Sequence, residues 1–263
     1  MNPTRQKYTP GHTASATAFQ AARELETHGF FLTPLLQPGF DVLDAGCGPG
    51  TISTGIAQTV FPGHVTAFDL SQKQLDQARR NAQGREIVNL DFVAGNVDQL
   101  PFADEAFHVV FAHALLEHLR DPMPALNEFH RVTKPGGFIG VCSPDWDAID
   151  LTSHPVRVDR AIQAYRTLQD CNGGNTRAGK HLADWLDQAG FTPLMHDLWY
   201  EEYEDPATLA EYLAVPLDLA GQFHHATALR NWAASPEAGI RLCWRYATGI
   251  RADGNTRRNL VLE

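Results

Sequence analysis

A glycine-rich turn is the first segment whose residue types could do chemistry. Residues 42–44 read as the end of a short buried strand, and a helix is expected from about Thr51. Between them lie glycines 46, 48 and 50, which let a ligand approach the backbone, while the helix N-terminus offers free N–H donors. The spacing is G-x-G-x-G, whereas the dinucleotide fingerprint requires G-x-G-x-x-G. The turn therefore predicts a ligand-binding loop, with a purely structural tight turn as the alternative.

An acid at the end of the next predicted strand supports this interpretation. Asp69 closes the apolar run of residues 64–69. In open α/β sheets ligands bind beyond the carboxyl ends of the strands, where such a carboxylate can accept both hydroxyls of a ribose. Taken alone, Asp69 could equally cap a helix. Beside the glycine turn it indicates a nucleotide-like ligand.

The elements that must position these residues alternate between strands and helices. Short apolar runs at 41–44, 64–69, 90–94, 107–112 and 138–142 are separated by segments with helical periodicity, of which one opens at a Ser71 capping box and another after Asp121-Pro122. Residues 192–200 and 243–250 give a sixth and a seventh strand. The pattern predicts an α/β fold: a Rossmann-like, seven-stranded, mostly parallel sheet with helices on both faces.

Three further stretches fall outside this alternation. Residues 1–36 are expected to form an N-terminal helical cap, and residues 37–263 form the main domain. Two insertions, near 145–175 and 206–237, are expected to be helical covers over the carboxyl edge of the sheet.

Composition narrows the class of protein. The 263 residues are 43% hydrophobic, and 31 acids against 21 bases give a net charge of −10, which disfavours a nucleic-acid partner. No apolar run is long enough for a membrane span or a secretory signal. The four scattered cysteines give neither metal-ligand spacing nor a disulfide framework, so a reduced, cytoplasmic setting without a metal is expected.

Successive motifs of the chain resemble those of class I S-adenosylmethionine-dependent methyltransferases. They are D-A-G-C-G-P-G-T from Asp44, F-D-L-S from Phe68, G-N-V-D-Q-L-P-F from Gly95, A-L-L-E-H-L-R-D-P from Ala114 and R-V-T-K-P-G-G from Arg131. They occur in order between residues 40 and 142 and are most similar to the small-molecule branch of ubiquinone and menaquinone biosynthesis methyltransferases. The resemblance implies S-adenosylmethionine as cofactor and a small organic methyl acceptor.

The resemblance also implies roles for single residues. Asp44 would organise the turn and reach the methionine ammonium, Asp69 would hold the ribose, and Leu70 would pack on the adenine. Many relatives have Asp where this chain has Asn96, whose amide can still meet the adenine edge. The remaining implied contacts to the cofactor come from Gly46, Cys47, Gly48, Gly50, Val97, Ala112, Tyr8 and His12. For Tyr8 and His12 a surface tail is the alternative.

Methyl transfer from a sulfonium is a direct displacement, so holding nucleophile and methyl in line supplies much of the rate. A base is needed only where the acceptor must lose a proton. His113, after the fourth strand, is the candidate base, with a lining role as the alternative. For Glu117-His118 packing is favoured, and Asp145-Trp146-Asp147 could border the acceptor or cap a helix.

The aromatic side chains of the covers would suit a flat or apolar acceptor, although core packing is the default for each of Trp199, Tyr200, Tyr203, Tyr212, Phe223 and Trp232. Adjacent histidines 224 and 225 do not make a metal site. Two other functions stay open: a non-catalytic S-adenosylmethionine-binding protein and a nucleotide-dependent oxidoreductase. The sequence also leaves a homodimer open.

Overall fold

A seven-stranded sheet forms the centre of the chain in the computed structural model, which describes residues 7–11, 13–152 and 155–253. Its strands are β1 (Val42–Ala45), β2 (Val65–Asp69), β3 (Leu90–Ala94), β4 (Phe107–His113), β5 (Thr133–Leu151), β6 (Thr192–Tyr203) and β7 (Ile240–Ile250). They lie in the order β3-β2-β1-β4-β5-β7-β6, and only β7 runs antiparallel to its neighbours. The predicted seven-stranded, mostly parallel sheet is confirmed.

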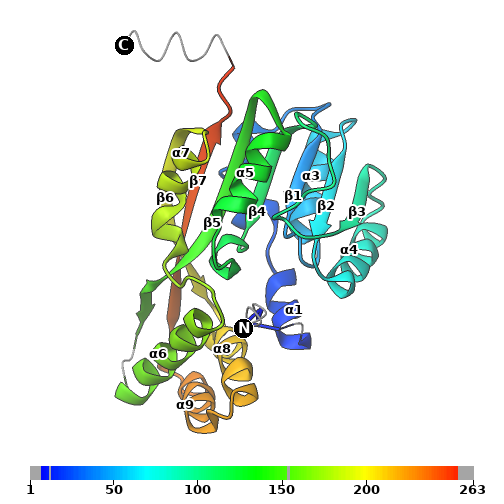
Figure 1. Ribbon diagram of the computed structural model, residues 1–263. Coiled ribbons are helices and arrows are strands. Elements are labelled where there is room, and N and C mark those ends of the chain that lie inside the picture. The colour runs from blue at the N-terminus through cyan, green and yellow to red at the C-terminus, as the bar shows by residue number, and fades with distance from the viewer. Residues whose placement is uncertain (1–6, 12, 153–154, 254–263) are drawn as a thin grey trace, which may run out of the picture.

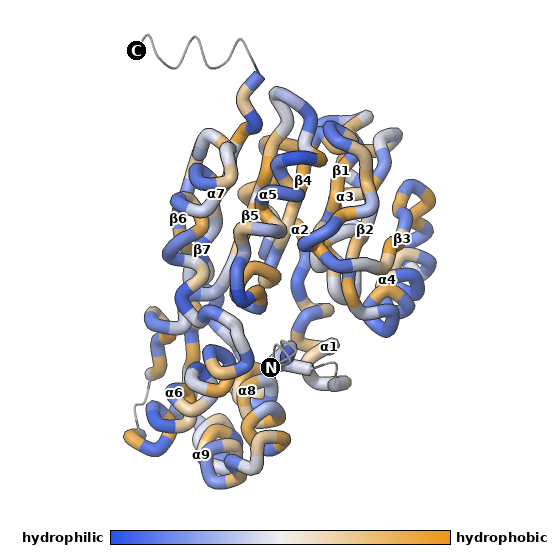
Figure 2. Tube along the Cα trace, in the orientation of Figure 1, coloured by the Kyte–Doolittle hydropathy of each residue, from blue (hydrophilic) through white to orange (hydrophobic). Residues whose placement is uncertain are grey.

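Helices cover both faces of this sheet (Figure 1). One face packs on α3 (Thr51–Val60) and α4 (Gln72–Gly84), and the other on α5 (Met123–Val132) and α7 (Leu182–Gln188). Side chains alternate between the faces along each strand, as the pleat requires, so Val42 belongs to the first core and Leu43 to the second. Burial on both faces explains why most residues of β1 and β4 are hydrophobic (Figure 2).

The predicted helix starts agree with the capping contacts. Ser71 Oγ accepts a hydrogen bond from Gln74 N at 3.4 Å and so caps α4. Asp121 Oδ1 accepts one from Met123 N at 3.0 Å at the start of α5. These caps begin each helix just after a parallel strand or loop, which fixes where the chain turns back over the sheet.

The first helix of the N-terminal stretch and the helices of the two covers lie beyond the carboxyl ends of the parallel strands (Figure 1). The N-terminal stretch contains α1 (Ala14–Ala21), α2 (Leu25–His28) and the short 3₁₀ helix η1 (Thr33–Leu35). The covers supply α6 (Val156–Cys171), α8 (Pro206–Leu219) and α9 (Phe223–Ala233), which pack on one another, and α1 contacts α8. Two further 3₁₀ helices are η2 (Leu116–His118) and η3 (Ala178–His181). Within the described ranges, no helix is both long and apolar enough to cross a membrane.

The first cover differs from the expectation at its start. Residues 145–151 were expected to be helical, but they continue β5, whose end pairs with the start of β7 at Asp150–Arg241 and Leu151–Ile240. The partner strand lies about ninety residues later in the chain, so local periodicity carried no sign of it. The helical part of this cover is α6.

Candidate functional site

A pocket of about 590 Å³ opens where β1, β2, β3 and β4 end. Its described lining residues lie between positions 8 and 119, and most directly follow one of these four strands. Ten of the side chains and glycines predicted for the site share this wall: Tyr8, Asp44, Gly46, Cys47, Gly48, Asp69, Leu70, Asn96, Val97 and His113. The structure therefore brings together residues that are up to 105 positions apart in the chain.

The glycine turn is held against the end of β2. The backbone amides of Gly46 and Cys47 both donate to the Phe68 carbonyl oxygen, at 2.7 and 3.1 Å. Gly46, Gly48 and Gly50 all have positive φ. A Cβ on Gly50 would lie 2.6 Å from the Ala78 methyl, so this glycine allows α3 and α4 to approach each other and does not line the pocket. The turn thus exposes only its first two glycines to a ligand.

Asp69 links the turn to the start of α4. One carboxylate oxygen accepts from Gly48 N at 2.9 Å, and the other accepts from Ser71 N at 2.8 Å. A carboxylate offers about four acceptor positions, so it can accept several donors at once. Two hydroxyls on adjacent carbons are a donor pair that fits this carboxylate.

Asp44 lies deeper, at 2% exposure, and its carboxylate accepts from Ser53 Oγ of α3 at 2.5 Å. Burial is the main cause that raises the pKa of Asp44 to about 7, and the Ser53 hydrogen bond opposes the shift. A cationic ligand group beside Asp44 would favour the ionised form.

Part of the pocket wall combines apolar and polar side chains that follow β2 and β3. Leu70 is 77% exposed in the pocket wall, and Val97 lies on the same wall. Asn96 Oδ1 accepts from Asp98 N at 3.1 Å, and Asp98 also lines the pocket. The sequence analysis did not single out Asp98, although it stands inside the quoted G-N-V-D segment. An exposed leucine next to polar edges suits a planar heterocycle.

His113 ends β4 at the inner wall. Its side chain is 7% exposed, and its Nε2 has no hydrogen-bond partner among the described residues. Burial, followed by the electrostatic effects of Arg23 and His28, holds the pKa of His113 well below its usual value, so the imidazole is neutral. A neutral imidazole with a free ring nitrogen can accept a proton or a hydrogen bond from a ligand.

A chain of polar side chains closes the pocket from the N-terminal side. Gln74 Nε2 donates to Gln20 Oε1 at 2.9 Å, and Gln20 Nε2 donates to Tyr8 Oη at 2.6 Å. The Tyr8 ring meets the His118 ring edge-on at 4.7 Å. Tyr8 is thus part of the wall, whereas His12 lies outside the described residues. The sequence offered no sign of Gln20, because its neighbours come from α4.

Glu117 and His118 have different surroundings. Glu117 is 2% exposed and accepts from Ser143 Oγ at 2.8 Å, and burial raises its pKa to about 7. His118 lines the pocket, and burial lowers its pKa to about 3. The packing interpretation fits Glu117, while His118 is a neutral wall residue.

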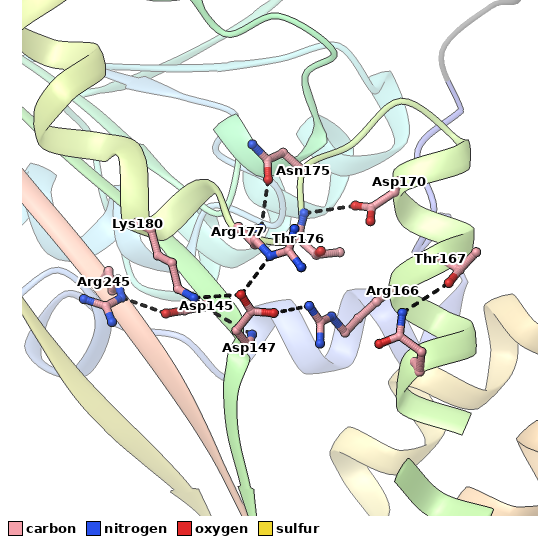
Figure 3. Close-up of polar contacts among 11 residues, drawn as sticks. Asp145, Asp147, Arg166, Thr167, Asp170, Asn175, Thr176, Arg177, Lys180 and Arg245 are labelled. Carbon is pink, nitrogen blue, oxygen red and sulfur yellow. Dashed lines mark hydrogen bonds and ion pairs between the residues drawn. The ribbon is translucent and has the colours of Figure 1, made fainter. Parts of the chain in front are cut away.

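Asp145 and Asp147 lie in an ionic cluster that ties β5 to its neighbours (Figure 3). The buried Asp145 accepts from Arg245 Nε at 2.8 Å, and Asp147 accepts from Arg177 Nε and Lys180 Nζ at 2.8 and 2.7 Å. Arg166 of α6 also bonds Asp147. The cluster therefore fixes the first cover to β5, and neither aspartate lines the large pocket.

The other predicted residues fall away from the large pocket. Ala112 is buried in the core on the α5 side of the sheet. Among the cover aromatics, Tyr200 and Phe223 are exposed, and Tyr212 lines a second, small cavity. The described residues contain no group of three potential ligands that could hold a metal.

Comparisons with known proteins agree with this geometry. Residues 43–141 match the methyltransferase domain family. An uncharacterized methyltransferase of Schizosaccharomyces pombe is 34% identical over 198 residues, which cover 72% of this chain and 70% of that protein. A demethylmenaquinone methyltransferase of Listeria welshimeri is 37% identical over 103 residues, 39% of this chain and 44% of the enzyme. The solved structure of a proposed methyltransferase from Bacillus halodurans superimposes with a TM-score of 0.66 at 18% identity, over 87% of this chain and all of that one.

Proposed function

Because this chain belongs to the S-adenosylmethionine-dependent methyltransferase family, we propose that it transfers the cofactor's methyl group to a small organic acceptor by in-line displacement. The observation that carries the proposal is one continuous pocket that joins the glycine turn and Asp69 to His113. Because the glycine turn and the end of β4 line the same pocket, it can hold a nucleoside against the turn and an acceptor against β4. The net charge of −10 disfavours nucleic acid as that acceptor.

The cofactor fits the donors and acceptors of the pocket wall. Asp69 would accept the ribose hydroxyls, Leu70 and Val97 would flank the adenine, and Asn96 would meet its edge. Gly46 and Gly48 leave room for the methionine part, and Asp44 would stabilise its ammonium. When bound, S-adenosylmethionine supplies an electrophilic methyl on a sulfonium that leaves as a neutral thioether.

The chain's own part in the reaction is positioning and proton removal. The buried wall around His113 excludes water and holds the acceptor in line with the methyl. The bound cofactor would supply an electrophilic methyl carbon to the acceptor's lone pair, and the electrons of the carbon–sulfur bond would remain on sulfur. The acceptor becomes more acidic as its bond to the methyl carbon forms, so the neutral His113 can then take its proton despite a low pKa.

Calorimetry on the whole chain tests the cofactor assignment. We expect S-adenosylmethionine and S-adenosylhomocysteine to bind, and NADH and NADPH not to bind. Binding of a nicotinamide cofactor alone would replace the proposal with an oxidoreductase. A screen of small acceptors for S-adenosylhomocysteine release then separates an enzyme from a non-catalytic binding protein, which would bind the cofactor and turn over no acceptor.

A further inference from the structure

Arg23 stands where two cavities meet. It follows α1, is 9% exposed, and lines both the 590 Å³ pocket and a small cavity of about 10 Å³, room for about one water. His118 is the other residue that both cavities share among the described lining residues. The small cavity is enclosed on its far side by residues of the covers and of β7, including Trp146, Tyr212 and Trp244.

Arg23 shares the small cavity with the carboxyl group of Glu117 but forms no ion pair with it. Among the described residues it makes no side-chain hydrogen bond and no ion pair, and it lies over the rings of Phe19 and Trp244, at 5.1 and 5.0 Å from their centres. Burying a permanent charge without a counter-ion is costly, and aromatic faces offset only part of that cost. The position thus calls for an anionic partner.

The carboxyl groups near this end of the sheet form hydrogen bonds or ion pairs with residues other than Arg23. Glu117 bonds Ser143, and with a pKa near 7 it is largely protonated below that pH. Glu201 accepts from Trp244 Nε1 at 2.8 Å and pairs with His28 at 3.1 Å. Asp145 is bound to Arg245 and Lys180, as Figure 3 shows. None of these acids forms an ion pair with Arg23.

We propose that Arg23 binds an anionic oxygen group, a carboxylate or a phosphate, on a methyl acceptor held in the large pocket. The inference rests on the proposed function, because it assigns the second ligand of the same pocket. A guanidinium offers a planar fork of donors that matches either group in two parallel hydrogen bonds. Its place favours the acceptor over the cofactor, because the Trp244 ring under its guanidinium group also contacts the ring of His113, at 4.8 Å between centres.

The test is calorimetry on the full chain saturated with S-adenosylhomocysteine. The probes are benzoate, phenyl phosphate and the neutral benzamide, which shares the ring but lacks the charge. We expect at least one anion to bind ten or more times tighter than benzamide. Arg23→Gln removes this preference, and Arg23→Lys keeps part of it because the charge stays without the fork. Arg241→Gln is the matched control, since Arg241 also lies over an aromatic ring, that of Tyr200, but away from the pocket.

Three results would overturn the inference. The first is equal affinity of the wild-type protein for anions and benzamide, or no binding of any probe while S-adenosylhomocysteine still binds. The second is a loss of S-adenosylhomocysteine affinity in Arg23→Gln with unchanged affinity for methylthioadenosine, which lacks the amino-acid carboxylate; Arg23 would then serve the cofactor. The third is failure of the wild-type protein to bind S-adenosylhomocysteine, which removes the proposed function itself.

Discussion

Replacing Asp69 tests the cofactor site at the carboxylate that would hold the ribose. Asp69 holds Gly48 N and Ser71 N and would accept two ribose hydroxyls. A hydrogen bond to a charged group contributes roughly 1.5–3 kcal/mol, and water recovers part of it in the free protein. We therefore expect Asp69→Ala to weaken S-adenosylhomocysteine binding by about 2–4 kcal/mol, or roughly 30- to 700-fold in Kd. Asp69→Asn keeps one acceptor oxygen and should cost about 1–2 kcal/mol.

Calorimetry measures these affinities, and two controls separate contact from collapse of the turn. Asp91→Asn, an exposed aspartate on β3 outside the pocket, should leave Kd within about twofold, as surface changes usually do. A ligand without ribose hydroxyls, dideoxyadenosine, should bind wild type and Asp69→Ala alike. Unchanged S-adenosylhomocysteine affinity in a folded Asp69→Ala protein would refute the ribose role. An equal loss for dideoxyadenosine would show that Asp69 acts only through the turn.

Four further predictions follow from single contacts. Gly50→Ala should lower the free energy of unfolding in urea by about 3 kcal/mol, and Gly136→Ala should lower it by about 1 kcal/mol. Both glycines have positive φ, but only a Cβ on Gly50 would also meet a methyl group of α4. Equal losses in the two variants would contradict this. At pH 6, S-adenosylhomocysteine binding should release up to about one proton as the ligand ammonium ionises Asp44, and calorimetry in two buffers should show no such release for Asp44→Asn. The pKa of Glu117 is raised to about 7, so its stabilising effect is complete below its unfolded pKa and is lost as pH rises through 7. Between pH 5 and 8 the free energy of unfolding of Glu117→Gln should therefore rise by up to about 3 kcal/mol relative to that of the wild type. A difference that stays constant with pH would contradict this. His113→Gln should lower turnover of a proton-losing acceptor by about 10²-fold or more with an unchanged cofactor Kd, whereas unchanged turnover would leave His113 a lining residue.

The sheet and the cofactor wall could be predicted because their signals are local. Each strand of the core is a short apolar run next to a turn or cap that the adjacent residues define, as at Asp44 to Gly50 and at Ser71. The ligand wall follows from where those strands end, since parallel strands bring their carboxyl ends to one edge. Asp69 and His113 therefore meet in one pocket, as expected.

The parts that escaped prediction depend on distant partners. Residues 145–151 form a strand because β7 arrives beside them, and Gln20 joins the wall because Gln74 of α4 bonds it. The special position of Arg23 comes from Trp244, more than two hundred residues away, and from the lack of an ion pair to any described acid. Such environments arise only when the chain is folded, so neither spacing nor composition could indicate them.

The division of the two cavities along the chain has an evolutionary consequence. The large pocket is built wholly from positions up to 119, and the family match ends at residue 141, whereas six of the ten residues around the small cavity come from position 144 onward. Duplicated copies of such a gene could change the second half and acquire new acceptors while they inherit the cofactor half unaltered. Arg23 belongs to the first half but contacts Trp244 of the second half. It would then be an inherited residue that limits which methyl acceptors the changed second half can bind.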